Sequence, residues 1–376
     1  MPGRLSVPLS VLDLCPVPTG VSVGEALRRS VDLARHAEWW GFRRYWVAEH
    51  HNMPGIASAA PAVLMGRIAA ATSTLRVGSG GVMLPNHAPL TVAEQFGTLE
   101  ALHPGRIDLG IGRAPGTNRV TAQALRRSAE GLPLAGFARQ VTELLAYFAG
   151  RPGADHAAGQ IRAIPAEGNQ PAVWLLGSTG YSAELAGQLG LPFAFAYHFS
   201  AANARPALAL YRRTFRPSAA LPEPYSLISV SVLCAADGAM AHWLHGSTRL
   251  SMLQLRAGHP ATLPSPDEAA ARPYSAAERT VIAEATGSHV VGDPATVIEL
   301  LDRLAASTGV DELMVTTSTF AHGDRLASYE LLGRAAASPA EQRPSVRGDV
   351  VPAVVPDHVG HAGGTGQAGD RAEPLR

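Results

Sequence analysis

The segment Glu49-His50-His51-Asn52 places a carboxylate and two imidazoles directly after a short apolar run. In an extended segment successive side chains point to opposite sides, so at most one of the two histidines faces the interior of a barrel. One imidazole beside the Glu49 carboxylate can donate or accept a proton near neutral pH, which predicts a catalytic proton-transfer site. Two alternatives stay open. One is purely structural hydrogen bonding, and the other is a metal site, against which the lack of helical His-Glu-x-x-His spacing and of a cysteine cluster argues.

Two glycine-rich segments follow further apolar runs. In Gly78-Ser79-Gly80-Gly81, three glycines let the backbone approach a flat ligand closely or adopt a positive φ, and the alternative is a simple tight turn. The segment 110–116 begins like a dinucleotide fingerprint, but Pro115 occupies the position of the third glycine, so a Rossmann fold is excluded. Arg113 in this segment is predicted to clamp a phosphate at the end of a strand, unless it forms a salt bridge with a neighbouring loop.

A fourth segment combines hydroxyl groups with the start of a helix. Ser178 and Thr179 follow an apolar run, and a helical pattern begins near Gly180. Hydroxyl groups and the free backbone N–H groups of a helix N-terminus bind anions, although an ordinary helix cap is the alternative. Together with Arg113, these residues predict a phosphate site after the fourth and fifth strands. Parallel barrels more commonly bind phosphate after the seventh and eighth strands.

These segments are positioned by an alternation of short apolar runs and helical patterns, which indicates βα units and a parallel sheet. The eight predicted strands favour a closed (β/α)8 TIM barrel, class α/β, over an open sheet, and its active site is then built at the carboxyl ends of the strands. The predicted strands are 8–13, 45–48, 75–79, 107–111, 173–176, 193–196, 227–234 and 312–317. The predicted helices are 23–40, 61–72, 90–102, a helical excursion in 118–150, one from 180, then 202–215, 239–256, 294–306 and a last helix ending near 337.

Composition along the chain predicts the domain organisation. Residues 1–337 are expected to form one barrel domain. Within it, the stretch 258–288 is rich in Pro, Ala, Ser and Glu, which predicts an insertion before the last βα unit and a candidate lid. Residues 338–376 have no hydrophobic periodicity and are predicted to be a disordered C-terminal tail.

The overall composition excludes several classes of function. The 376 residues carry a formal net charge of zero, which argues against nucleic acid or an anionic membrane as the main partner. The chain contains no lysine, so Schiff-base, P-loop and carbamylated-lysine chemistry are excluded. Cys15 and Cys234 lie far apart, which argues against a disulfide framework or a zinc cluster. No uncharged apolar stretch approaches roughly 18 residues and the N-terminus is a poor signal peptide, so we expect a cytoplasmic protein.

Three motifs taken together resemble the flavin-dependent branch of the bacterial luciferase-like monooxygenases, and the resemblance covers about residues 5–337. They are Ala48-Glu49-His50-His51-Asn52, the run from Val77 to His87, and Gly105-Arg106-Ile107-Asp108-Leu109-Gly110. The resemblance implies a β/α barrel with an insertion, commonly dimeric.

The resemblance also implies roles for individual residues. His50 would be the active-site histidine, and Gly80 and Gly81 would be joined by a cis peptide bond that lies against a flavin ring. Arg113, Ser178 and Thr179 would hold the flavin phosphate.

The activity implied by the resemblance is a monooxygenation. FMN, reduced by a separate flavin reductase, would react with O2 in a site shielded from water, and a small organic substrate would be hydroxylated or undergo Baeyer–Villiger oxygen insertion. At the positions that correspond to 177 and 112 of this chain, luciferase itself has a carboxylate and a reactive thiol. At the positions that correspond to 80 and 81 it has a pair of alanines. All four are glycines here, so light emission is not implied. Three alternatives remain: an F420-dependent dehydrogenase, a non-catalytic flavin-binding protein and a metal-dependent hydrolase.

Overall fold

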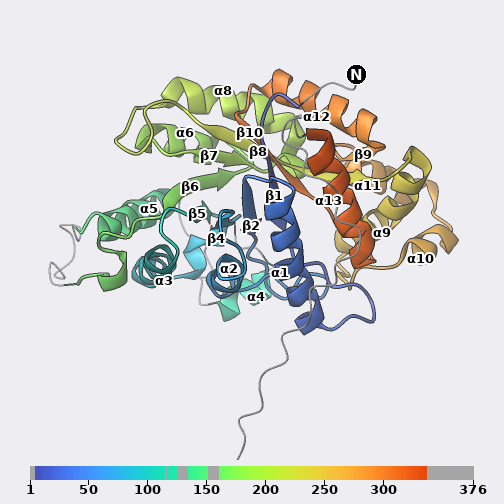
Figure 1. Ribbon diagram of the computed structural model, residues 1–376, viewed down its shortest axis with the longest axis horizontal. Helices are drawn as coiled ribbons and strands as arrows, with labels where there is room; N and C mark the ends of the chain where they lie inside the picture. The colour runs from blue at the N-terminus through green and yellow to red at the C-terminus, as the bar shows by residue number, and fades with distance from the viewer. Residues whose placement is uncertain (1–4, 115–116, 118, 126–133, 151–160, 337–376) are drawn as a thin grey trace, which may run out of the picture.

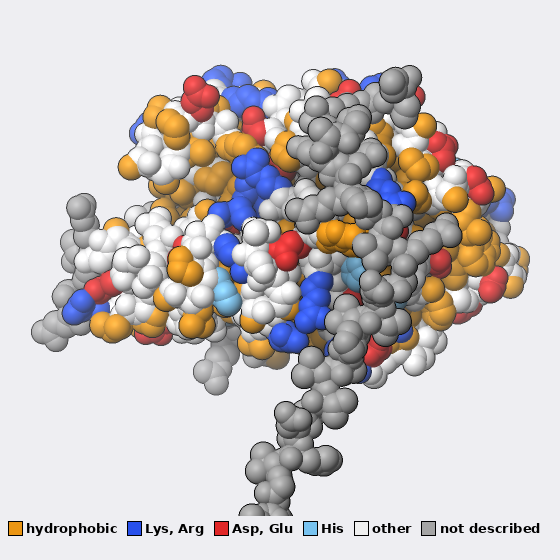
Figure 2. Space-filling view, in the orientation of Figure 1, with side chains coloured by type: hydrophobic (Ala, Val, Ile, Leu, Met, Phe, Trp, Pro, Cys, Tyr) orange, Lys and Arg blue, Asp and Glu red, His pale blue; other side chains and the backbone are white. Residues whose placement is uncertain are grey.

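The computed structural model describes residues 5–114, 117, 119–125, 134–150 and 161–336. The predicted tail, 338–376, therefore lies outside the described residues. On the face shown in Figure 2, arginine, acidic and hydrophobic side chains are intermixed, in keeping with the net charge of zero.

Eight parallel strands form a closed barrel, which confirms the predicted (β/α)8 architecture (Figure 1). Each strand pairs with the next in chain order, and β10 closes the barrel by pairing with both β1 and β8. The strands are buried on both faces, which explains why their sequences read as continuous apolar runs. The barrel strands are β1 (Leu9–Asp13), β2 (Arg44–Val47), β3 (Arg76–Ser79), β5 (Ile107–Gly112), β6 (Ala172–Gly177), β7 (Phe193–Phe195), β8 (Ser226–Cys234) and β10 (Glu312–Thr316).

Two short strands that the sequence did not predict extend the carboxyl end of the barrel. β4 (Val82–Met83) pairs with the end of β5, and β9 (Val290–Gly292) pairs with the end of β8. Segments of two or three residues are too short to show an alternating pattern, so they are recognised only by the strand that they pair with.

Helices surround the barrel (Figure 1), and most lie where the periodicity placed them. Pro61 starts α2 at its first turn, as predicted, but the helix ends at Ala69 rather than at Thr72. Arg106 satisfies carbonyl groups at this end, because its guanidinium donates to the carbonyl oxygens of Ala69 (3.1 Å) and Thr72 (3.0 Å). The helices are α1 (Val23–Trp39), α2 (Pro61–Ala69), α3 (Pro89–Leu102), α4 (Arg119–Ala124), α5 (Leu134–Phe148), α6 (Gly180–Leu189), α7 (Tyr197–Ser200), α8 (Ala204–Thr214), α9 (Gly238–Arg256), α10 (Pro266–Ala271), α11 (Ala276–Thr286), α12 (Pro294–Thr308) and α13 (His322–Ala336); three 3-10 turns are η1 (Leu84–Asn86), η2 (Ile164–Ala166) and η3 (Ala201–Asn203).

The predicted insertion contains regular structure. Its helices α10 and α11 both pack against α9. Ser275 caps α11 in a reciprocal capping box with Glu278, so the local sequence defines where that helix begins. Before α10, Leu263 exchanges backbone hydrogen bonds with Val17 (2.8 Å) and Thr19 (2.9 Å) in the loop after β1. The insertion is thereby tied to the carboxyl rim of the barrel.

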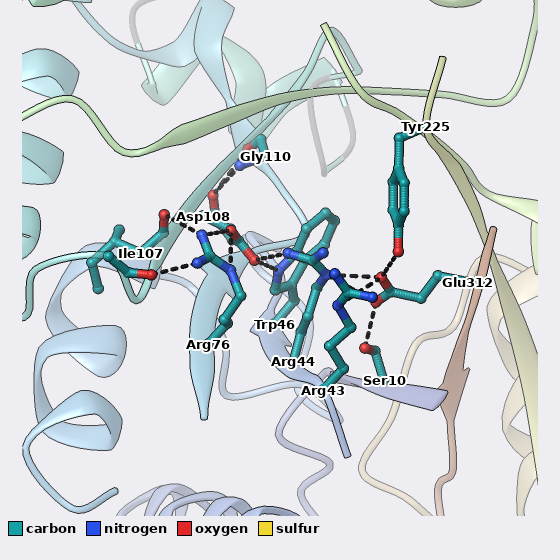
Figure 3. A network of polar contacts seen from close by, with 12 residues as sticks. Ser10, Arg43, Arg44, Trp46, Arg76, Ile107, Asp108, Gly110, Tyr225 and Glu312 are labelled. Carbon is teal, nitrogen blue, oxygen red and sulfur yellow. Dashed lines mark hydrogen bonds and ion pairs between the residues drawn. The ribbon is translucent and has the colours of Figure 1, made fainter. Parts of the chain in front are cut away.

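A network of buried charges fills the amino end of the barrel (Figure 3). Arg44 at the start of β2 bridges Asp108 (2.9 Å) and Glu312 (2.9 Å). Asp108 also accepts from Arg76 (2.6 Å) and from the indole nitrogen of Trp46 (3.0 Å). Because both carboxylates have several donors, the charges are compensated although they lie in the interior.

Candidate active site

The residues predicted to do chemistry follow four neighbouring barrel strands. His50, the Gly80–Gly81 pair, Arg113 and Ser178 come after the ends of β2, β3, β5 and β6, which are adjacent in the barrel. Since all eight strands are parallel, these segments lie at the same carboxyl end. The structure thus brings the predicted site residues to one side of one mouth.

The peptide bond between Gly80 and Gly81 is cis, as the resemblance implied. Neither glycine has a positive φ, so a left-handed backbone is not the reason for glycine at these positions. The reason is the lack of space for a side chain. A Cβ on Gly81 would lie 2.7 Å from the carbonyl oxygen of Gly110, and a Cβ on Gly80 would lie 2.8 Å from Leu12 Cδ1. The backbone of this pair between β3 and β4, called the glycine surface below, is therefore closely packed and leaves no room for a side chain.

Trp46 supports this glycine surface from inside the barrel. Its indole carbon Cε3 lies 3.1 Å from the position of a Cβ on Gly80, and a Cβ on Gly78 would lie 2.4 Å from its Nε1. The same Nε1 donates to Asp108 (Figure 3), so one side chain connects the mouth to the buried charge network.

His50 is half-buried, and its Nδ1 is fully buried with no hydrogen-bond partner among the described residues. Burial lowers its pKa to about 4, and the neighbouring His198 and His51 act in the same direction, while Glu49 opposes them. The imidazole is therefore neutral near pH 7. A neutral imidazole has one donor and one acceptor nitrogen, so it can take up or release a proton at its accessible side.

Glu49 is fully buried and accepts hydrogen bonds from four groups. The donors are the backbone nitrogen of Met83 (2.9 Å), the Asn86 amide (3.0 Å), and Nε2 of His51 (2.9 Å) and of His87 (2.9 Å). Burial raises its pKa, but the bonds from His87 and His51 outweigh this, so the pKa lies below the usual value and Glu49 is ionised. With both oxygens occupied, Glu49 anchors β4 and η1 beside the glycine surface.

The two adjacent histidines have different neighbours. His51 bonds to Glu49, while His50 lies within electrostatic range of His198, which follows β7. His198 Nδ1 donates to the carbonyl oxygen of Ser229 on β8 at 3.0 Å, and burial lowers its pKa, so it is also neutral. The bond leaves Nε2 as the acceptor nitrogen of His198.

A further histidine pair joins the residue before β9 to α9, because His289 and His245 are hydrogen-bonded at 2.9 Å. His198 and His289 carried no recognisable spacing in the sequence, since they lie on separate βα units. Among the described residues, no group of three or more His, Cys, Asp or Glu side chains is arranged to hold a metal ion.

Arg113 and the start of α6 come together. The guanidinium carbon of Arg113 lies 5.1 Å from the ring centre of Tyr181, in the first turn of α6. The residue before this helix, Thr179, is exposed and its side chain makes no capping hydrogen bond. In α1 and α9, by contrast, Ser22 and Asp237 do cap. The first turn of α6 thus has a cation beside it and no side-chain cap, which suits an anionic ligand.

Comparisons with known proteins agree with this arrangement. Residues 7–312 match the family model of the luciferase-like monooxygenases. A luciferase-like monooxygenase of Escherichia coli (strain K12) is 48% identical over 87% of this chain and 96% of the relative. A Bacillus subtilis (strain 168) protein named N-acetyl-S-alkylcysteine monooxygenase is 34% identical over 87% of this chain and 97% of the relative.

Solved structures share the fold. The crystal structure of apo-MsnO8 matches with a TM-score of 0.80 and 39% identity over 88% of this chain and 97% of that chain. A type II Baeyer–Villiger monooxygenase from Pseudomonas putida, in complex with FMN, matches at 0.65 with 16% identity over 87% and 98% of the two chains. An F420-dependent secondary alcohol dehydrogenase matches at 0.66 with 14% identity over 88% and 99%. At such low identities the last two show the fold alone.

Proposed function

Because this chain belongs to the luciferase-like monooxygenase family, we propose that it is a monooxygenase that uses reduced FMN and O2 to oxygenate a small organic substrate. The observation that supports this most is the convergence of the cis glycine pair, His50 and the Arg113–α6 corner at one mouth. A flat surface, a polar group at its edge and an anion site are what a phosphorylated tricyclic ring requires.

The residues present fit FMN. Gly80 and Gly81 would offer bare backbone to the ring, because neighbouring protein atoms 2.7–2.8 Å from the position of a Cβ exclude side chains there. The unpartnered Nδ1 of His50 lacks a polar partner that a bound ligand could provide. Arg113, the hydroxyls of Ser178 and Thr179, and the N–H of Gly180 would hold the phosphate. When bound, FMN supplies the redox chemistry with O2.

The protein's own residues would manage protons and water. His50, neutral at pH 7, would hold or move a proton at its imidazole beside the ring and the substrate. Glu49 would act as a positioning residue, since its four hydrogen bonds fix β4, η1 and His51. The insertion 258–288, bonded to the loop after β1, would exclude water from the mouth.

FMN is favoured over F420 by the sequence relationships. The relatives at 34% and 48% identity are named monooxygenases, whereas the F420-dependent structure is only 14% identical. F420-dependent oxidation of an alcohol remains the second candidate, and non-catalytic flavin binding the third. Because a relative is named for N-acetyl-S-alkylcysteines, organic thioethers are the first substrates to test.

We further propose that the protein is a cytoplasmic homodimer that receives reduced FMN from a separate reductase. The outer faces of α1 and α2, which lie side by side in Figure 1, line a hollow of about 540 Å³. Its apolar floor is bordered by the charged residues Arg28, Asp32, Arg35 and Arg67. Beside it Val63 is 78% exposed and Val23 is 54% exposed, and exposed apolar surface of this kind typically marks an interface. No helix in the described ranges has the length and apolar character needed to span a membrane.

Anaerobic titration with FMN, reduced FMN and F420 tests the cofactor assignment. We expect FMN to bind in the micromolar range or tighter, and Arg113→Ala to weaken it roughly 10- to 100-fold, the loss of about 1.5–3 kcal/mol from one charge-assisted bond. Riboflavin, which lacks the phosphate, should bind both forms equally. Preferential binding of F420 would move the assignment to the second candidate, and reduced FMN that binds without accelerated oxygen consumption would favour the third.

A further inference from the structure

We propose that a small apolar pocket at the carboxyl rim, between β1 and β10, binds a short unbranched alkyl group of the substrate. The pocket has a volume of about 90 Å³ and lies next to Leu14, directly after β1, and Ser318, two residues after β10. Its outer wall is α9 and its roof is the start of the insertion. The proposal deepens the proposed function and rests on it, but the test below does not require flavin or turnover.

The walls of this alkyl pocket are fixed by backbone hydrogen bonds. The backbone N–H of Val17 donates to the carbonyl oxygen of Gly55 (3.0 Å), and that of Leu263 donates to the carbonyl oxygen of Val17 (2.8 Å). The three segments that contain these residues are thereby joined side by side over the pocket. Thr19 and Thr262 add a hydroxyl–hydroxyl bond of 2.8 Å. The segments also touch closely, because a Cβ on Gly55 would lie 2.5 Å from the carbonyl oxygen of Ala261. The pocket is therefore preformed rather than created by a ligand.

The lining selects for an uncharged, apolar group. None of the residues that line the pocket, all of which are described, is charged. Met53 and Met252 are among them, and their flexible thioethers adapt to alkyl chains. The hydroxyl of Thr248 already donates to Ser318 (3.2 Å), so it is not left for a polar ligand.

The volume limits the length of the alkyl group. In proportion to an apolar cavity of about 150 Å³ that binds the six carbons of benzene, a pocket of about 90 Å³ holds roughly three to four carbon atoms. An apolar cavity of about 150 Å³ is known to take benzene, so a phenyl ring is expected to be too large here. The pocket therefore suits a chain of about three carbons.

One wall of the pocket comes from the loop that carries the proposed catalytic histidine. Met53 lies three residues after His50, in a loop that His50 closes by donating its backbone N–H to Ser58 (2.9 Å). The backbone N–H of Ile56, which also lines the pocket, donates to the carbonyl oxygen of Met53 (3.0 Å). An alkyl group in the pocket would thus lie against the loop that carries His50.

Methyl NMR of the full-length protein, recorded with and without FMN, tests this assignment. The chain has seven methionines, so ¹³C-methyl-methionine labelling gives a simple spectrum. Methyl n-alkyl sulfides from ethyl to hexyl serve as probes. We expect the methyl signals of Met53 and Met252 to shift, whereas Met65, in the core, and Met240, 46% exposed at the start of α9, stay unchanged. A Met252→Ala variant assigns one signal and enlarges the pocket.

The dependence on chain length gives the decisive readout. Affinity should rise roughly fourfold per methylene, as expected for burial of a CH2 group, and level off near three carbons. Ser251→Leu, which fills the pocket, should shorten this limit and weaken binding more than tenfold. The matched control Ser307→Leu, on the exposed face of α12, should not. Met252→Ala should admit benzyl methyl sulfide.

Two results would overturn the proposal: no shift of Met53 and Met252 with any probe, or an affinity that increases evenly to hexyl and ignores Ser251→Leu. Because the readout is local, the outcome is separable from the cofactor assignment. If FMN does not bind but the signals of Met53 and Met252 shift, the proposed oxygenase function is refuted and the alkyl pocket stands. If FMN binds but these signals do not shift, only the alkyl pocket is refuted.

Discussion

Replacing Glu49 by glutamine should separate positioning from direct catalysis. The carboxylate accepts from four donors, two of them the imidazoles of His51 and His87 at 2.9 Å. The amide oxygen of glutamine can accept about two hydrogen bonds. Its NH2 group is itself a donor, so it cannot accept from the remaining two donors. Losing two charge-assisted bonds costs about 3–6 kcal/mol, and an imidazole that changes tautomer can recover part of this, so we expect about 2–4 kcal/mol of destabilisation.

The loss should depend on pH in a defined direction. Because the pKa of Glu49 in the folded protein is lower than in the unfolded chain, the ionised carboxylate stabilises the fold above the unfolded pKa. That stabilisation is lost as the pH falls through the lower, folded value. The difference in unfolding free energy between wild type and Glu49→Gln should therefore be largest near pH 7 and should shrink below about pH 4.3.

Urea unfolding at several pH values, together with FMN titration, measures both effects. The matched control is Glu38→Gln, because Glu38 also accepts backbone N–H groups, from Ser73 and Leu75 at 2.8 Å, but lies on α1 away from the mouth. Both variants should lose stability, and only Glu49→Gln should also weaken FMN binding. If Glu49→Gln unfolds like the wild type yet has lost turnover, Glu49 acts on substrate or cofactor directly and the positioning argument is wrong.

Three further results are expected. Trp46→Phe removes the 3.0 Å bond to Asp108 and should lower stability by about 1–2 kcal/mol in urea unfolding and weaken FMN binding; an unchanged FMN affinity would show that the indole does not support the glycine surface. His198→Asn removes a neighbour that lowers the pKa of His50, so ring-¹⁵N NMR should find that pKa above about 4, and an unchanged value contradicts the pairing. Val63→Asp places a charge on the α1–α2 face and should convert a dimer into a monomer in light scattering, whereas a persistent dimer would place the interface elsewhere.

The barrel and the rim residues were predictable because each depends on local pattern. A strand buried on both faces reads as an apolar run, and the residue after its end is at the mouth in any parallel barrel. His50 and Arg113 could therefore be placed from the sequence. The approach of His198 to His50 could not be predicted, since it depends on the α7 turn after β7, which spans only Tyr197–Ser200.

The buried network shows a different limit. Asp108 interrupts an apolar strand, which indicates a charged partner. Its partners Arg44 and Arg76 come from the starts of β2 and β3. The second carboxylate that binds Arg44, Glu312, comes from the last strand. Their meeting requires that β10 pair with β1 and close the barrel, a property of the whole chain rather than of any segment. Removing one partner would leave an uncompensated interior charge, so closure and network stabilise each other. Through Trp46 this mutual dependence reaches Gly80, so the rigidity of the proposed flavin surface depends on the strands that close the far side of the barrel.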